Sequence, residues 1–167
     1  METPITPDQA KARAALAAVP ALVDLQDWER LERCLSERLT IDYTSLWGGE
    51  PQKMSRDELL AQWKGLLPGF DATRHELGHV VISVVGDRAE AEAPVSGTHV
   101  LDGRAWIVSG RYKATLTRGG DGWLRATGRA ELGAQPTAHI EITADKLRRR
   151  HVTLARSVAT DGELKWD

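Results

Sequence analysis

The stretch VVISVVGDRAEAEAPVSGTHVLDGRAWIVSGRYKATLTRGGDGWLRA, residues 80–126, contains the pattern that decides the fold. Runs rich in β-branched residues are separated by turn residues at Gly86-Asp87, at Asp102-Gly103 and at 119–122. Glycine and aspartate favour hairpin turns because they tolerate a positive φ. The pattern therefore predicts consecutive antiparallel strands over residues 73–85, 88–100, 104–118 and 123–132.

Helical patterns precede these strands. Thr6-Pro7-Asp8-Gln9 is a capping box with proline at the first helical position, and it predicts a helix that runs to about Asp24. Asp27 caps a second predicted helix, and Ser55 begins a third with its own capping box. A short strand is expected from Leu39 to Thr44. Together these elements predict an α+β fold, in which N-terminal helices pack on a strongly curved, mixed or antiparallel sheet and enclose a pocket.

Length and composition limit the possible classes of protein. A chain of 167 residues can form one domain with its own core, and we expect residues 1–132 to form it, with 133–167 as a C-terminal extension of the same domain. The net charge of −2 gives no reason to expect nucleic acid or a membrane surface as a partner. Cys34 is the single cysteine, which excludes a disulfide framework and favours a reducing compartment. We expect a cytoplasmic protein.

HELGH, at residues 75–79, matches the zinc-protease pattern H-E-x-x-H. That pattern binds zinc only on a helix, where the two imidazoles lie one turn apart. The following residues, 80–85, are nearly all β-branched and favour a strand. On a strand, the Cα atoms of His75 and His79 would lie about 13 Å apart, too far to share one ion. We expect no metal site here.

Several stretches carry a resemblance to a known family. DWERL at residues 27–31 and LTIDYTSL at 39–46 resemble the start of the scytalone dehydratases, which belong to the SnoaL-like branch of the NTF2-like superfamily. Gly110-Arg111-Tyr112, followed by Asp121-Gly122-Trp123, is similar to the usual ending of SnoaL-like domains. The resemblance covers roughly residues 8–132. It implies a conical NTF2-like fold that binds a small molecule.

The resemblance also implies a catalytic set. Tyr43 matches the tyrosine that polarises the substrate carbonyl, His75 matches the histidine that acts as base and then as acid, and His99 matches the second histidine. Asp24 matches the aspartate that orients this second histidine. Such a site would remove water from a cyclic ketone, polyketide or steroid-like substrate by acid–base chemistry, with no metal and no organic cofactor.

The expected pocket departs from the family in two places. Val23 stands where the family has a second tyrosine. The family's Ser-x-Asn pair falls near Ser109 and Arg111, so its asparagine is absent. We expect these three residues to line the pocket, together with Trp47 and Trp63.

Two alternatives to a dehydratase or cyclase remain open. An isomerase resembling ketosteroid isomerase would need a carboxylate deep in the pocket, and Asp42 and Glu92 are poor candidates for it. A non-catalytic binding module is common in this superfamily. The strands also carry apolar residues on both faces, which favours a dimer or trimer: Val80, Ile82 and Val84 alternate with Leu77, Val81 and Val85.

Overall fold

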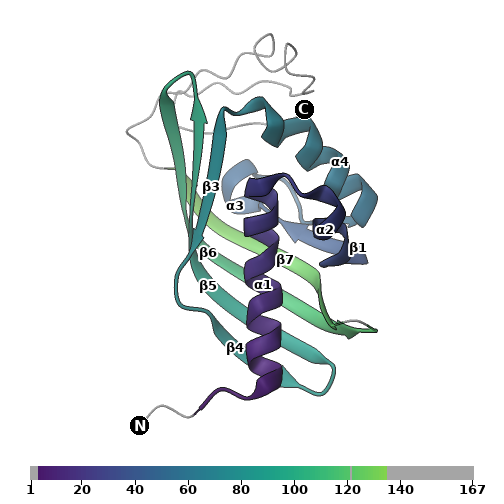
Figure 1. Cartoon of the computed structure of the whole chain (residues 1–167). Helices are drawn as coiled ribbons and strands as arrows, with labels where there is room; N and C mark the ends of the chain where they lie inside the picture. The colour runs from purple at the N-terminus through teal and green to yellow at the C-terminus, as the bar shows by residue number, and fades with distance from the viewer. Residues whose placement is uncertain (1–3, 121, 135–167) are drawn as a thin grey trace.

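The computed structural model describes residues 4–120 and 122–134 (Figure 1). Its helices are α1 (Pro7–Leu25), α2 (Trp28–Arg33), α3 (Thr44–Trp47), α4 (Arg56–Leu66) and the 3-10 turn η1 (Leu67–Gly69). Its strands are β1 (Leu35–Asp42), β2 (Gln52–Ser55), β3 (Ala72–Leu77), β4 (Val81–Val85), β5 (Arg88–Leu101), β6 (Arg104–Gly119) and β7 (Gly122–Ala134). Nearly all of the predicted C-terminal extension lies outside the described residues.

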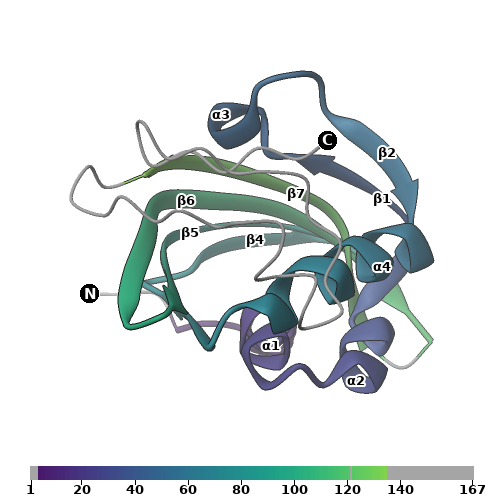
Figure 2. The same cartoon turned by 90° about the horizontal axis from the view of Figure 1, so that it is seen from above.

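The described strands form one sheet in the order β2-β1-β7-β6-β5-β3, with β4 also paired to β5. The pairings are antiparallel, except that β1 and β7 run parallel. Figure 2 shows the sheet curving strongly, with α1, α2 and α4 lying on its open side. The predicted α+β class, with helices packed on a curved mixed sheet, is confirmed.

The predicted helix starts and hairpins are also confirmed. Thr6 and Ser55 each close a reciprocal capping box, at the starts of α1 and α4. Gly86, Asp102 and Gly103 adopt positive φ angles of 58°, 51° and 73° in the two turns that bound β5. These turns are only two residues long, so they fix the register of the strands that they join.

The single strand predicted over residues 73–85 is wrong, because it is two strands, β3 and β4, separated by residues 78–80. Both pair with the same edge of β5, on either side of Pro94. Proline has no N–H to donate to a neighbouring strand. The Pro94 carbonyl accepts a 2.9 Å hydrogen bond from the Gly78 N–H, but nothing can be returned, and the regular ladder stops there.

The strand predicted at Leu39–Thr44 exists with shifted ends, since β1 covers Leu35–Asp42 and Tyr43 follows it as the cap of α3. A short edge strand, β2, was not predicted; it pairs with β1 through residues 52–55. The Asp42 carboxylate accepts from the backbone N–H and the hydroxyl of Thr44, at 3.0 and 2.6 Å, and so turns the chain out of β1.

Helix α1 joins two hydrophobic clusters beneath the sheet. Ala12 and Leu16 pack with Ala89, Leu116 and Trp123 in one cluster. The second cluster contains Val19, Val23, Leu31, Leu35, Leu39, Leu59, Phe70 and Trp106, among others. The C-terminal half of α1 therefore ends over the second cluster, and this position brings Asp24 to β3.

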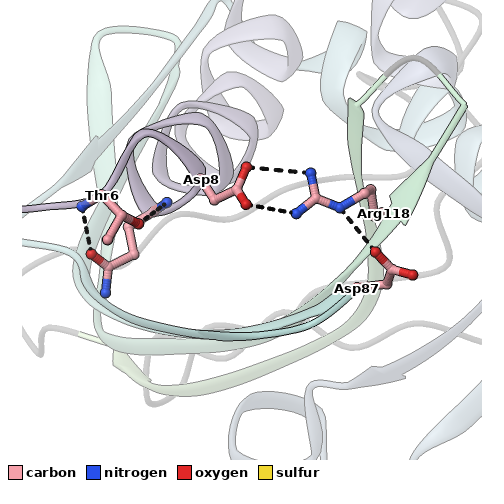
Figure 3. Close-up of polar contacts among 5 residues, drawn as sticks. Thr6, Asp8, Asp87 and Arg118 are labelled. Atoms are coloured by element: carbon pink, nitrogen blue, oxygen red, sulfur yellow. Dashed lines mark hydrogen bonds and ion pairs between the residues drawn. The ribbon is translucent and has the colours of Figure 1, made fainter.

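Arg118 on β6 fastens the start of α1 to the sheet (Figure 3). Its guanidinium donates to both carboxylate oxygens of Asp8 at 2.9 and 3.3 Å, and to Asp87 in the β4–β5 turn at 3.0 Å. The guanidinium also lies 4.6 Å from the centroid of the Trp123 ring. These groups are partly exposed, so we assign them a role in orienting α1 more than in stability.

Candidate active site

Asp24, in the last turn of α1, is held by several donors from β3. One carboxylate oxygen lies 2.7 Å from Nδ1 of His75 and 3.1 Å from the Thr73 hydroxyl, and the other accepts from the His75 backbone N–H at 2.6 Å. Burial alone would raise the pKa of Asp24, but the hydrogen bonds from His75 and Thr73 outweigh it and lower the pKa. Asp24 is therefore a carboxylate at neutral pH.

This contact fixes the orientation of the His75 ring. Since an ionised carboxylate can only accept, the proton of a neutral His75 lies on Nδ1 and the lone pair on Nε2. The ring lies over Gly97 of β5, the partner of His75 in the ladder. A Cβ at Gly97 would lie 3.0 Å from Cδ2 and 3.2 Å from Nε2 of His75, so glycine is what lets the ring lie there. The His75 side chain is only 10% exposed.

His99, two residues further along β5, packs against this ring. The two imidazole centroids are 5.3 Å apart with their planes at 89°, and His99 also contacts the rings of Phe70 and Trp106 at 5.1 and 4.8 Å. Burial and the neighbouring His75 lower the pKa of His99 to about 3. Its Nδ1 has no hydrogen-bond partner within the described part of the chain. His99 is therefore neutral at neutral pH.

The expectation that Asp24 orients His99 is corrected by these contacts, because Asp24 binds His75 instead. Sequence spacing could not distinguish the two histidines, since both face the interior from neighbouring strands. The position of α1 beside β3 determines that Asp24 binds His75. The same contacts add Thr73 to the site, a residue whose place beside Asp24 depends on packing between elements 49 residues apart.

Two tyrosines face the same interior. Tyr43 packs against the second hydrophobic cluster, and burial raises the pKa of its phenol. Burial also raises the pKa of Tyr112 on β6, and the nearby Tyr43 and Asp24 raise it further. Both phenols therefore keep their protons at neutral pH and can donate hydrogen bonds. Tyr112 was not among the site residues expected from the sequence. Strand alternation from Trp106 and Val108, which are buried, could have indicated its inward direction.

The expected pocket residues fall into different places. Val23 is 6% exposed and packs in the hydrophobic core, and Trp63 packs against the same core. Ser109 pairs with Ser96, its hydroxyl 3.3 Å from that of Ser96, on the sheet face opposite to His99. Arg111 is exposed on that outer face and forms a 2.5 Å ion pair with Glu92.

Ser109 and Arg111 thus do not join the histidines, because a shift of one residue along a strand moves a side chain to the other face. Trp47 ends α3, and its side chain lies outside what the structure describes.

The HELGH stretch forms no helix. Residues 75–77 belong to β3, and His79 is exposed in the link between β3 and β4. Among residues 4–120 and 122–134, no group of three or more His, Cys, Asp or Glu side chains is arranged to hold a metal ion. Over the same residues, no helix is long and apolar enough to cross a bilayer.

Comparison with known proteins identifies the family of this chain. The protein-family model for the SnoaL-like domain matches residues 5–129 of the sequence. A scytalone dehydratase-like protein of Claviceps purpurea (strain 20.1) is 35% identical over 69 residues, which is 41% of this chain and 42% of that protein. The match therefore spans less than half of the relative's length.

Solved structures show the same fold. The Kfla4162 protein of Kribbella flavida is 28% identical, with a TM-score of 0.70 over 84% of this chain and 97% of that one. A candidate dehydratase from the NTF2-like family of Streptomyces avermitilis is 16% identical, with a TM-score of 0.60 over 73% and 94% of the two chains. On these matches and on the helix-covered curved sheet, the chain belongs to the SnoaL-like family and has the NTF2-like fold.

Proposed function

We propose that this protein is a proton-transfer enzyme of the dehydratase type, which removes water from a cyclic β-hydroxyketone or related polyketide. The observation that carries the proposal is that the Asp24 carboxylate accepts hydrogen bonds from both the imidazole and the backbone N–H of His75. A general base must be held in one tautomer with its free nitrogen toward the substrate. The similarity to a scytalone dehydratase-like protein supports the same class of reaction.

In the proposed first step, Nε2 of His75 takes the proton on the carbon next to the substrate carbonyl. The C–H bond pair moves to form an enolate, and the new imidazolium is stabilised by the Asp24 carboxylate. The phenol of Tyr43, aided by that of Tyr112, donates a hydrogen bond to the enolate oxygen. Both phenols are suited to this role because their raised pKa values keep them protonated.

In the second step, the enolate electrons form the carbon–carbon double bond and the C–O bond to the β-hydroxyl breaks. His75 returns its proton to the departing oxygen, so that water leaves and the neutral imidazole is restored. His99 stays neutral throughout, since its pKa is about 3. It supports the His75 ring from the side and can offer its unpartnered Nδ1 to the substrate.

An isomerase with an aspartate base is less well supported. Both oxygens of Asp24 are already occupied by His75 and Thr73, and Glu92 pairs with Arg111 on the outer face. A non-catalytic binding module is favoured by one observation, the packing of His99 between the rings of Phe70 and Trp106. The two remaining functions differ in whether His75 moves a proton.

The test is a proton-exchange and water-loss assay in D₂O, read by NMR. Cyclohexanone reports deuterium uptake next to the carbonyl, and 3-hydroxycyclohexanone reports water loss. We expect His75→Ala to lower both rates by about a hundredfold or more, the usual contribution of a general base. Asp24→Asn should lower the rates as well, because an amide can present its N–H to Nδ1 and favour the wrong tautomer.

His79→Ala is the matched control, because His79 is an exposed histidine four residues along the chain from His75. It should leave both rates unchanged. Rates that His75→Ala does not reduce would overturn the assignment of the base. Ketone binding without any exchange would favour the binding module.

A further inference from the structure

Arg125, on β7, is an arginine buried inside the cone. It is 4% exposed, although arginine is among the residues least often buried. The residue reaches this position through an irregularity in the β6–β7 ladder, where Leu116 pairs with Arg125 but Thr115 pairs with Thr127. The extra residue on β7 is a bulge, a feature that redirects side chains.

Two of the three guanidinium nitrogens of Arg125 lack hydrogen-bond partners in the part of the chain that the structure describes. Its Nε and Nη2 atoms are buried and make no hydrogen bond among residues 4–120 and 122–134. A guanidinium is always charged. A buried charge without an opposite charge or hydrogen bonds is among the costliest arrangements in a fold. An anion bound to these two nitrogens would offset the cost of burying the charge.

The donor edge of the Arg125 guanidinium lies against the backbone of Gly128. A Cβ at Gly128 would lie 2.3 Å from Nη2 and 3.0 Å from Nε, so a larger residue there would force the guanidinium to move. These two N–H groups form the parallel fork that matches the two oxygens of a carboxylate. Both atoms are closed to water, so the guanidinium or its neighbours must shift as a ligand enters.

Arg125 is also connected to the proposed catalytic residues. Its guanidinium carbon lies 5.6 Å from the centroid of the Tyr112 ring. The Arg125 charge acts on the phenols of Tyr43 and Tyr112, and the Asp24 charge acts on Tyr112. The described interior therefore contains an acid–base pair at Asp24 and His75, two phenols and the Arg125 guanidinium.

We propose that the ligand of this interior is a carboxylic acid, whose carboxylate binds the Nε and Nη2 donors of Arg125. This inference rests on the proposed function for the ligand's role as substrate, which would then be an acidic hydroxyketone. The carboxylate would lie at the Arg125 end and the reacting carbonyl near Tyr43, which sets the direction in which the substrate binds.

The test uses carboxylates matched with their neutral amides: acetate and acetamide, benzoate and benzamide, 2-naphthoate and 2-naphthamide. Thermal unfolding and titration calorimetry compare the full-length wild type with Arg125→Met, Arg125→Lys and Arg111→Met. Arg111→Met is the matched control, because it removes an exposed arginine from the outer face. We expect at least one carboxylate to bind more tightly than its amide. Arg125→Met should weaken that binding about ten- to a hundredfold, Arg125→Lys should weaken it less, and Arg111→Met should not change it.

Without ligand, Arg125→Met should unfold at a higher temperature than the wild type, since it removes an unpaired buried charge. A lower unfolding temperature would mean that the guanidinium is already satisfied, and would overturn the proposal. So would the absence of any carboxylate preference, or a preference that survives Arg125→Met.

The variant His75→Ala separates this proposal from the proposed function. It should keep the carboxylate preference while losing proton exchange on cyclohexanone. Exchange that depends on His75 without a carboxylate preference would overturn the ligand assignment alone. A carboxylate preference that depends on Arg125, in a protein with no exchange, would overturn the proposed reaction alone.

Discussion

The two halves of β5 face the same interior but carry different side chains. The first half presents Ala89, Ala91 and Ala93, which pack with the cluster that contains Leu16 of α1. The second half presents Gly97 and His99, with the His75 ring lying over the glycine. Small residues allow a helix to approach closely in the first half, and they leave room for an imidazole in the second.

The comparison shows how one strand can serve both stability and a polar site. In the first half, every inward side chain is apolar and buried, so its contribution is packing. In the second half, a buried imidazole with an unpartnered nitrogen lies among aromatic rings, which lowers stability. We therefore expect substitutions in the two halves to affect different properties.

The largest expected effect concerns the pH dependence of stability at His99. Its folded pKa of about 3 lies below the unfolded value of 6.5, so the unfolded chain binds more protons between these pH values. Stability should therefore fall as pH decreases from about 6.5 toward 3, by up to roughly 5 kcal/mol. The lowered pKa of Asp24 adds a loss in the same direction below pH 3.8.

His99→Leu should flatten this profile, and it should not destabilise the protein at neutral pH because it removes an unpartnered buried nitrogen. Urea unfolding at a series of pH values measures the effect, with the exposed His79 substituted as the control. An unchanged acid profile in His99→Leu would show that the loss arises elsewhere.

Leu16 of α1 packs against the first half of β5. Leu16→Ala should cost about 2–5 kcal/mol of unfolding free energy, because Leu16 is 2% exposed and its removal leaves a cavity. The rate of proton exchange per folded molecule should stay the same. Calorimetry and the NMR exchange assay measure the two quantities. A large loss of exchange in the folded fraction would mean that this half also controls the site.

In the second half of β5, Gly97→Ala should affect catalysis more than stability. The new Cβ would lie 3.0–3.3 Å from the rings of His75 and His99, so the His75 ring must move. We expect the exchange rate to fall about ten- to a hundredfold, since small displacements of a catalytic group have effects of this size. Ser96→Ala, on the outer face of the same strand, is the control. Equal rates in wild type and Gly97→Ala would argue against catalysis by His75.

The smallest expected effect on stability concerns the outer face of the sheet. Val81 and Val85 on β4 are 64% and 78% exposed, and we propose that this face joins copies of the chain. Val81→Lys with Val85→Lys should change the unfolding free energy of one subunit by about 0.5 kcal/mol or less. Light scattering should show a smaller assembly than the wild type forms. A wild type that is already monomeric would contradict the proposal.

Much of the fold was predictable because its signals are local. The two-residue turns on either side of β5 and the capping boxes at Thr6 and Ser55 each depend on residues within a few positions of one another. The break between β3 and β4 was not predicted, because its cause, Pro94, lies on the neighbouring strand. β2 was missed because its four residues have no clear alternation.

The candidate site was predictable only in part. The resemblance brought Asp24, Tyr43, His75 and His99 into consideration, and the structure places Asp24, His75 and His99 in one cluster. The resemblance could not indicate that Ser109 and Arg111 face outward, since a shift of one residue along a strand moves a side chain to the other face. Arg125 was not considered, because a charged residue near a turn is usually exposed.

The sequence by itself determined the hairpins and the helix starts, because local backbone preferences decide them. Only the tertiary structure decided which histidine Asp24 binds and that Arg125 is buried, with no hydrogen bond from Nε or Nη2 in the described part of the chain. Both depend on how distant elements cross, α1 over β3 and β7 after its bulge. Side-chain partners across such distances are fixed by packing geometry, which no local pattern in the chain contains.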